Sequence, residues 1–267
     1  MIAVFIVLTI IILLILLYLF VFTRPCTNKP YNKILLRDYA HRGLHGEKVP
    51  ENSLSAFELA CRNNFGIELD VQLSKDGTVM VFHDYSLLRM TGTDCKLSSL
   101  DYSKLSQMEL LNTKETIPSF KEVLELVNGR VHILVELKGE SLDASLCPKV
   151  AELLKEYKGE YCIESFNPFL IKEMRKYLPT AFYGQLYTNV CRDKKKYSIL
   201  NILLTGMVFN FLSRPDFIAY NKLDRNSPVV RFITKVYRIP KFVWTAKGKS
   251  EIEDAHTYSE YAIFEMK

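Results

Sequence analysis

From about residue 37 onward, short apolar strands alternate with longer helical patterns, and this alternation limits the folds open to the chain. Helical apolar spacing at 146–157 and 169–177, for example, separates runs rich in β-branched and aromatic residues. The predicted strands end near residues 41, 70, 136, 165, 187, 221, 245 and 265. Strands separated by helices form βα units of a parallel sheet. Eight such units predict an α/β fold, a closed (β/α)8 TIM barrel with its active site at the carboxyl ends of the strands.

One segment of the chain departs from this alternation. Residues 67–73 and 78–82 are both strand-like, and Lys75-Asp76-Gly77 between them is typical of a tight turn. So short a connection makes the two runs antiparallel. We therefore count 67–73 as the barrel strand and 78–82 as an added arm, which places Asp70 roughly opposite His83.

Carboxylates and imidazoles gather where these strands end. Glu68 and Asp70 share one face of their strand because side-chain direction alternates with a period of two, and the hairpin brings His83 toward them. Paired carboxylates repel each other unless a cation or proton lies between them, and Mg²⁺ or Ca²⁺ prefers such oxygen ligands. The pattern favours a metal site. The alternative for any one of these residues is a solvated strand face or an ordinary hydrogen-bonded histidine.

The motifs that carry these residues resemble the glycerophosphodiester phosphodiesterase family. The matching segments are His41-Arg42-Gly43, Pro50-Glu51-Asn52-Ser53, Glu68-Leu69-Asp70, Asp76-Gly77, His83-Asp84, Ile117-Pro118-Ser119-Phe120, Val135-Glu136-Leu137-Lys138, Ser165-Phe166-Asn167 and Val243-Trp244-Thr245. Their order and spacing agree with the family along most of the chain beyond residue 37. The resemblance implies a TIM barrel in which residues 85–116 form a small insertion over the mouth of the active site.

The resemblance also implies an activity, the metal-dependent hydrolysis of glycerophosphodiesters to an alcohol and sn-glycerol 3-phosphate. One divalent metal ion, Mg²⁺ or Ca²⁺, is expected on three carboxylates, Glu68, Asp70 and Glu136. His41 and His83 are expected to divide the general acid and base roles, because imidazole titrates near neutral pH. The sequence does not decide which histidine takes which role.

The remaining predicted site residues contact the substrate or support the ligands. Arg42 and Lys138 are expected to bind the phosphate, and Trp244 to form an apolar wall for the glycerol or the head group. Glu51 is either a further metal ligand or the partner of Arg42. Asn52 or Ser53 could cap the helix at 53–64, so Asn52 is an active-site residue, the N-cap of that helix, or both. A solvated Glu136–Lys138 pair and a core tryptophan are the plain structural alternatives.

The chain departs from the family pattern near its end. Ala246 and Lys247 stand where the family usually carries Asn after the Trp-Thr pair, and the chain ends in Ala262-Ile263-Phe264-Glu265-Met266-Lys267 rather than in a strand followed by Thr-Asp and Pro. The metal and histidine residues are intact, whereas the shape of the alcohol pocket is put in question.

The first 22 residues are apolar and uncharged, about the length that crosses the hydrocarbon core of a bilayer. We expect a transmembrane anchor at 1–23, a linker at 24–36 and the barrel at 37–267. A cleaved signal peptide is disfavoured because no Lys or Arg precedes the apolar run. Arg24, Lys29, Lys33 and Arg37 follow it, so the positive-inside rule predicts a single-pass cell-membrane protein with a cytoplasmic catalytic domain.

Composition narrows the classes of partner. The formal net charge of +5 comes without an arginine-rich stripe, which argues against nucleic acid as a partner and is compatible with anionic substrates or a membrane surface. The six cysteines lack metal-ligand spacing and fit free thiols in a reducing compartment, although an even count also allows disulfides.

A second apolar run, residues 197–212, follows a basic cluster at 192–196. It is either a helix lying in the membrane interface or a buried barrel helix. Two alternative functions follow from these features. One is a lysophospholipase D-like cleavage of membrane lysophospholipids, and the other is a catalytically silent sensor of lipid head groups that keeps the barrel.

Overall fold

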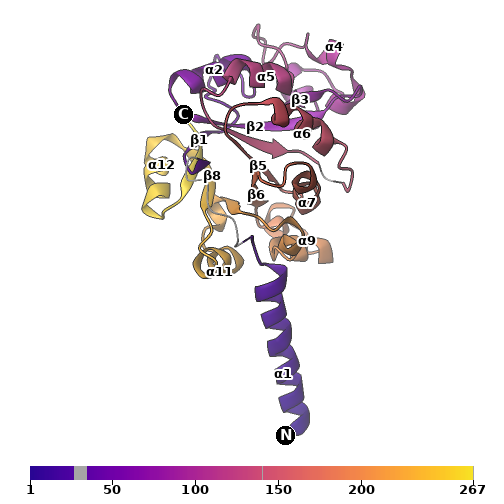
Figure 1. The fold of residues 1–267 in the computed structure, drawn as a ribbon, viewed down its shortest axis with the longest axis vertical. Coiled ribbons are helices and arrows are strands. Elements are labelled where there is room, and N and C mark those ends of the chain that lie inside the picture. Colours follow the sequence, from indigo (N-terminus) through magenta and orange to yellow (C-terminus); the bar gives the residue numbers. More distant parts are fainter. Residues whose placement is uncertain (27–34, 140, 267) are drawn as a thin grey trace.

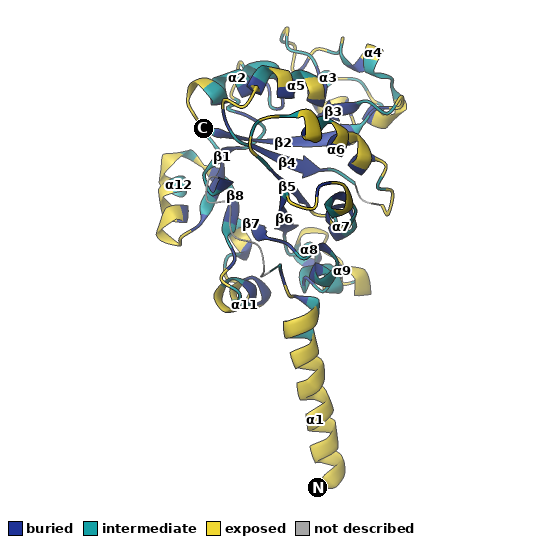
Figure 2. Cartoon of the chain, in the orientation of Figure 1, coloured by how far each residue is buried: buried dark blue, intermediate teal, exposed yellow. Residues whose placement is uncertain are grey.

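The computed structural model describes residues 1–26, 35–139 and 141–266. A long N-terminal helix projects from a barrel domain (Figure 1). This helix is α1 (Ile2–Leu17), continued by a π-helical turn, η1 (Tyr18–Phe22), and its first turns are exposed on all sides (Figure 2). Among the described residues it is the one helix long and apolar enough to cross a membrane, a property that a signal sequence near an N-terminus shares.

The domain is a closed barrel of parallel strands, as the strand count predicts. The barrel strands are β1 (Tyr39–Ala40), β2 (Gly66–Leu73), β4 (Ile133–Leu137), β5 (Tyr161–Ser165), β6 (Phe182–Tyr187), β7 (Phe217–Asn221), β8 (Lys241–Lys247) and β9 (Tyr261–Glu265). Neighbours pair in that order, and β1 closes the ring by pairing with both β2 and β9. The predicted TIM barrel is therefore confirmed.

The added arm of the hairpin is β3 (Val79–Val81), which pairs with β2 in the antiparallel sense outside the ring. Val71 pairs with Val81, and the amide of Phe82 donates to the carbonyl of Asp70. Asp70 therefore lies opposite Phe82, one residue short of the expected partner His83. Strand β3 has ended before His83, so the alternation of side chains along the strand does not set the direction of the His83 side chain.

The barrel interior changes from apolar to acidic along the strands. Leu134 on β4 and Cys162 on β5 belong to an interior cluster with Tyr39, Phe217 and other apolar side chains. Two residues further along the same strands, on the same face, come the carboxylates of Glu136 and Glu164. Acidic groups thus lie at the carboxyl ends of the strands, above an apolar floor.

Close packing inside the barrel explains a glycine on β6. A Cβ at Gly184 would lie 2.2 Å from the ring of Phe217, so no larger residue fits without moving that ring. The ring of Phe217 in turn stacks on Phe182. The floor beneath the carboxylates is therefore closely packed.

Helices surround the barrel. They are α2 (Leu54–Arg62), α5 (Phe120–Val127), α6 (Leu146–Glu156), α7 (Pro168–Tyr177), α8 (Val190–Asp193), α9 (Ile199–Thr205), α10 (Asn210–Ser213), η4 (Lys222–Asp224), α11 (Pro228–Val236) and α12 (Gly248–Thr257). Of these, α2, α5, α6, α7 and α11 bury apolar faces against the barrel, whereas the buried residues of α9 and α10 are polar. Ser119 caps α5 in a capping box with Glu122. Ser53 caps α2, which leaves the side chain of Asn52 for another partner.

The residues predicted as an insertion fold into short elements above the hairpin. They contain α3 (Leu88–Thr91), η3 (Leu97–Ser99) and α4 (Tyr102–Leu105). A small core of their own, including Leu87, Met90 and Leu97, packs on Met80 and Phe82 of the arm. Sequence-local packing of this kind holds the segment over the end of β2 without disturbing the barrel.

The C-terminal end of the apolar N-terminal helix packs on the barrel. The hydroxyl of Tyr18 donates to the carbonyl of Gly206 at 2.7 Å, and the rings of Phe22 and Phe211 meet edge to face. The amide of Cys26 donates to the carbonyl of Pro215. Residues 27–34 of the predicted linker, with Lys29, Pro30 and Lys33, lie outside the described residues.

The second apolar run is neither fully buried nor fully exposed. It forms α9 and α10, which follow β6 together with α8. Asn201 and Asn210 are buried, whereas Ile199 is 80% exposed and Ile202 is 53% exposed. All six cysteines are free thiols.

Candidate active site

Three carboxylates meet at the carboxyl ends of β2 and β4. Glu68, Asp70 and Glu136 are buried, and their ligand oxygens all lie within 4.8 Å of one another. The register explains the convergence, because Asp70 pairs directly with Glu136 across the two parallel strands. Each residue supplies a hard oxygen donor, which is the kind that Mg²⁺ and Ca²⁺ bind.

Two cationic side chains border this carboxylate cluster. The ammonium of Lys138 lies 2.8 Å from Asp70 Oδ1 and 2.8 Å from Glu136 Oε1. The backbone amide of Arg42 donates to Glu68 Oε2 at 2.9 Å, and its guanidinium Nε lies 3.4 Å from Asp70 Oδ2. Arg42 has a φ of 55°, a left-handed conformation that turns its amide and side chain toward the same cluster.

The pKa shifts of the three carboxylates indicate that Lys138 and Arg42 do not compensate all of their negative charge. Burial, together with Asp70 and Glu136, raises the pKa of Glu68 well above its usual range. Burial also raises the pKa of Glu136 to about 7, against the opposing effect of Lys138. Although burial alone would raise it, Lys138 and Arg42 hold the pKa of Asp70 below its usual range. A divalent cation fits this donor set, because it would satisfy all three carboxylates in their charged forms.

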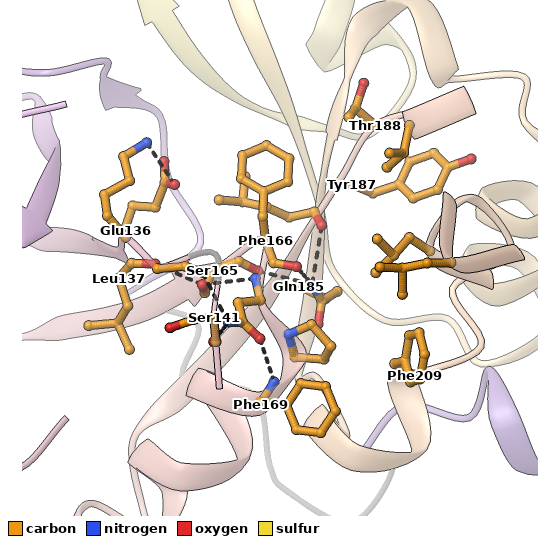
Figure 3. A pocket seen from close by; sticks show the side chains of 18 of the residues that line it. Glu136, Leu137, Ser141, Ser165, Phe166, Phe169, Gln185, Tyr187, Thr188 and Phe209 are labelled. Carbon is orange, nitrogen blue, oxygen red and sulfur yellow. Dashed lines mark hydrogen bonds and ion pairs between the residues drawn. The ribbon is translucent and has the colours of Figure 1, made fainter. Parts of the chain in front are cut away.

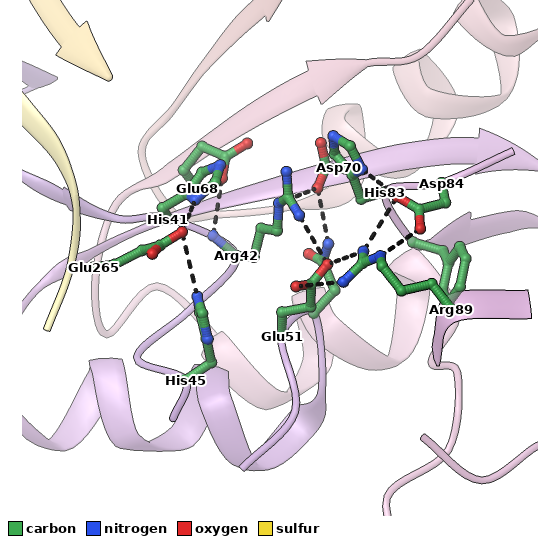
Figure 4. A network of polar contacts seen from close by, with 12 residues as sticks. His41, Arg42, His45, Glu51, Glu68, Asp70, His83, Asp84, Arg89 and Glu265 are labelled. Atoms are coloured by element: carbon green, nitrogen blue, oxygen red, sulfur yellow. Dashed lines mark hydrogen bonds and ion pairs between the residues drawn. The ribbon is translucent and has the colours of Figure 1, made fainter. Parts of the chain in front are cut away.

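The two histidines flank the carboxylates (Figure 4), where His41 lies beside Glu68 and His83 beside Asp70. His41 Nδ1 is 3.0 Å from Glu265 Oε1, and His83 Nδ1 is 2.5 Å from Asp84 Oδ1. A carboxylate on Nδ1 orients the ring and leaves Nε2 for proton transfer. Burial lowers the pKa of both imidazoles below their usual value.

Glu51 is engaged by arginines. Its Oε1 accepts from the guanidinium of Arg42 at 2.8 Å, and both of its oxygens accept from Arg89 at 2.6 and 3.0 Å. Arg89 belongs to α3 and also binds Asp84, the partner of His83. The insertion is thus tied to the site through one guanidinium.

Asn52 contacts the carboxylate cluster directly. Its Nδ2 donates to Asp70 Oδ2 at 2.8 Å, while the neighbouring Ser53 serves as the cap of α2. The sequence left open whether Asn52 is an active-site residue or a helix cap. Its described contacts hold Asp70 in place and do not cap α2. The φ of Asn52 is 56°, which its short polar side chain tolerates.

Trp244 lies on β8 and is half-buried. Its indole N–H donates to the carbonyl of Ala219 at 3.2 Å, and its ring meets Phe166 edge to face with centroids 5.6 Å apart. Because one end of the ring is fixed by a hydrogen bond, its remaining surface presents a defined apolar wall. The structure therefore brings all ten sequence-predicted site residues to the carboxyl end of the barrel.

Two acidic side chains of the site, Glu164 and Glu265, were not predicted from the sequence. Glu164 is buried, its Oε2 has no hydrogen-bond partner among the described residues, and burial followed by Glu68 and Glu136 raises its pKa. Glu265 binds His41, and it comes from the terminal strand that departs from the family pattern. Both follow apolar residues of their strands with the parity of Glu136, a signal that could have identified them.

A cavity of about 910 Å³ opens beside the carboxylates (Figure 3). We call it the side cavity. Its lining includes His83, Glu136 and Lys138, and also Leu204, Met207 and Phe209. In Figure 3 Glu136 and Phe209 lie on opposite sides of the cavity, and Phe166 and Gln185 lie between them. Its size is at the upper end of the range of ligand pockets, and most of its far wall is aliphatic or aromatic.

The architecture and the side chains of the site indicate one class of protein. Buried carboxylates that fit one divalent cation, with two oriented imidazoles and two neighbouring cationic side chains at the active end of a TIM barrel, are typical of a metal-dependent hydrolase of phosphate esters. Residues 41–263 match the model of the glycerophosphoryl diester phosphodiesterase family. The chain belongs to this family, whose members are divalent-metal-dependent enzymes that hydrolyse glycerophosphodiesters.

Individual relatives agree with this assignment. The chain is 33% identical over 55% of its length to a glycerophosphodiester phosphodiesterase of Caldanaerobacter subterraneus, and spans 65% of that protein. It is 33% identical over 48% of its length to a lysophospholipase D of Rattus norvegicus, and spans 44% of it. The crystal structure of a glycerophosphodiester phosphodiesterase of Thermotoga maritima superposes with a TM-score of 0.66 at 27% identity, covering 86% of this chain and 94% of that one.

Proposed function

We propose that this chain hydrolyses glycerophosphodiesters to an alcohol and sn-glycerol 3-phosphate. The observation that carries the proposal is the meeting of three buried carboxylates, Glu68, Asp70 and Glu136, with two oriented histidines at the carboxyl end of the barrel. In the overall reaction the P–O bond to the alcohol breaks and an oxygen from water bonds to phosphorus. One proton of that water ends on the alcohol, and the other leaves with the phosphate or the solvent.

Glu68, Asp70 and Glu136 would hold one divalent ion, Mg²⁺ or Ca²⁺, and both ions suit an all-oxygen donor set. When bound, the ion supplies positive charge to the phosphate oxygens and polarises the phosphorus. The side-chain amide of Asn52 holds Asp70 by a hydrogen bond, and the ammonium of Lys138 forms ion pairs with Asp70 and Glu136.

The cations of the chain bind and orient the phosphate. Arg42 offers a planar guanidinium held by Glu51, so that its position costs little conformational entropy when an anion binds. Lys138 adds a compact positive charge, and Asp70 and Glu136 keep it protonated by raising its pKa despite burial. Trp244 provides the apolar wall for the carbon skeleton of the glycerol or the head group.

His41 and His83 divide the proton transfers. One imidazole takes the proton of the attacking oxygen, and the other donates a proton to the leaving alkoxide. Glu265 and Asp84 fix the tautomers by accepting from Nδ1, and they stabilise the imidazolium that forms during transfer. The two rings lie on either side of the carboxylates, as attack and departure on opposite sides of a phosphate require.

A lysophospholipid is the second candidate substrate, supported by the side cavity and by the likeness to the rat lysophospholipase D. The chemistry at phosphorus would be the same. The catalytically silent sensor stays as the outcome to be tested against both, and nothing in the geometry of His41, His83 or the carboxylates favours it.

The proposal includes a place in the cell. We propose residues 1–23 as a single-pass membrane anchor, 24–36 as the linker and 37–267 as the catalytic barrel, with 85–116 as its insertion and the catalytic domain on the cytoplasmic side. Packing of Tyr18 and Phe22 on the barrel supports an anchor that stays attached, because a cleaved signal sequence has no need of such contacts. The activity of a reporter fused after Lys267 tests the orientation.

The test is product analysis with the full chain in detergent. With glycerophosphocholine and Mg²⁺ or Ca²⁺, we expect choline and sn-glycerol 3-phosphate, followed by phosphorus NMR. His83→Asn should lower kcat by about a hundredfold or more. His256→Asn is the matched control, because His256 is half-exposed and pairs with Asp38 away from the site. No turnover of any glycerophosphodiester or lysophospholipid by a folded, metal-supplied chain would overturn the proposal in favour of the sensor.

A further inference from the structure

The side cavity links the carboxylate cluster to the segment that follows β6. Glu136 and Lys138 line it, and so do Leu200 and Leu204 of α9. Strand β6 ends at Tyr187 and α8 begins at Val190, so α8 and α9 lie at the carboxyl end of the barrel, where the active site is. A polar phosphodiester at the carboxylates leaves the far, apolar end of the cavity unfilled. The cavity is therefore built for a substrate with an apolar part.

The outer face of α9 is apolar as well. Ile199 and Ile202 are mostly exposed, and Tyr197 just before the helix is 81% exposed. Lys194, Lys195 and Lys196 precede them and are exposed too. Exposed lysines followed by exposed aliphatic and aromatic side chains are typical of a segment in the membrane interface, where the lysines meet anionic head groups.

The candidate anchor lies against the same segment. The hydroxyl of Tyr18 donates to the carbonyl of Gly206, and the side-chain amide of Asn210 donates to the carbonyl of Thr23 at 3.4 Å. In Figure 1 the helix α1 leaves the barrel next to α9. A bilayer that holds residues 2–22 therefore adjoins the residues of α9, which identifies the occupant of this exposed face as lipid.

We propose that α9 lies in the membrane interface and that the side cavity receives the acyl chain of an amphiphilic phosphodiester drawn from the bilayer. This inference rests on the proposed function and names its substrate class, a single-chain glycerophospholipid. The phosphate lies at Glu136 and Lys138, and the chain runs along Phe166 toward Leu204 and Phe209. Leu200 faces both the cavity and the outside, so α9 is the wall through which the chain enters.

The kinetic test compares two substrates with the same head group, lysophosphatidylcholine in phosphatidylcholine vesicles and glycerophosphocholine in solution. The full chain is reconstituted with Mg²⁺ or Ca²⁺. We expect kcat/KM to be about a hundredfold or more higher for the lysophospholipid, because the buried chain adds apolar binding energy. Leu204→Gln should lower the ratio of the two kcat/KM values about tenfold.

The outer face of α9 is tested separately. The double variant Ile199→Ser, Ile202→Ser should slow hydrolysis of vesicle-bound lysophospholipid while its rate on the same lipid in monomeric form stays near that of the parent. Leu111→Ser is the matched control, because Leu111 is an exposed leucine in the insertion. Equal losses in the double variant and in the control would contradict the interfacial role of α9.

Binding gives a readout that does not need turnover. Trp244 is the single tryptophan of the chain and packs on Phe166, which lines the cavity. A lysophospholipid brominated along its chain should quench Trp244 fluorescence, and Leu204→Gln should weaken that quenching. An unquenched Trp244 together with equal rates on the two substrates would overturn the inference and leave the proposed function standing. If neither substrate is hydrolysed, the proposed function is overturned. Quenching alone then decides whether the side cavity binds the acyl chain.

Discussion

At the scale of single residues, the site is organised around carboxylates that share too few cations. Glu68 and Glu136 have raised pKa values, whereas Asp70, with the closest cations, has a lowered one. The same strand therefore carries one carboxylate that stays charged and one that takes up a proton readily. A site of this kind binds a divalent cation by exchanging protons for it.

The affinity for Mg²⁺ or Ca²⁺ should consequently depend on pH. Burial raises the pKa of Glu136 to about 7, and a protonated carboxyl does not ligate the metal. Affinity should be highest above pH 7 and fall as the pH drops through 7, by up to about tenfold per pH unit for each proton displaced. Calorimetric titration at several pH values between 8 and 6 measures this. A dissociation constant that stays the same over that range would contradict the account.

The three carboxylates of the site were predicted from the sequence, but their partners were not. Strand alternation places Glu68 and Asp70 on one face, whereas Glu136 was expected only from the resemblance to the family. Glu265 as the partner of His41, and Arg89 as the bridge from Glu51 to Asp84, depend on contacts between segments far apart in sequence. Local patterns carry no information about such pairs.

At the scale of elements, helices start where the sequence places caps. The capping box of Ser119 and Glu122 and the cap at Ser53 were both readable, because a cap is a local hydrogen bond within one turn. The one-residue offset of the hairpin was not, because the turn is centred on Asp76: the amide of Ser74 donates to the carbonyl of Thr78, and Leu73 pairs with Val79. Whether α9 is buried was also open, since its periodicity fits either setting.

Removing a cap should cost a predictable amount of stability. Ser119→Ala takes away the oxygen that accepts from the amide of Glu122. We expect the free energy of unfolding to fall by about 1 kcal/mol, measured by urea denaturation in detergent. Ser103→Ala, at an exposed position of α4, should change it by less than about 0.5 kcal/mol. Equal changes in the two variants would show that the box does not stabilise α5.

For the whole molecule, the closed barrel brings together strands and helices that are far apart in the sequence. The closed ring brings β2, β4 and β9 to one end, so that Glu68, Glu136 and Glu265 become neighbours of two histidines. The connection after β6 places α9 between the site and the candidate anchor. Strand count and alternation were enough to predict the ring. They could not predict the side cavity, whose walls come from several loops.

Metal-dependent hydrolysis is best tested by titrating the chelator-treated full chain with Mg²⁺ or Ca²⁺ and following metal binding and release of sn-glycerol 3-phosphate in one sample. We predict that the rate rises in step with the binding of one ion per chain. Glu68→Gln should lower both affinity and rate by about a hundredfold or more. Glu47→Gln, at an exposed position, should change neither. A full rate in the presence of chelator, or a Glu68→Gln variant as active as the parent, would contradict the account.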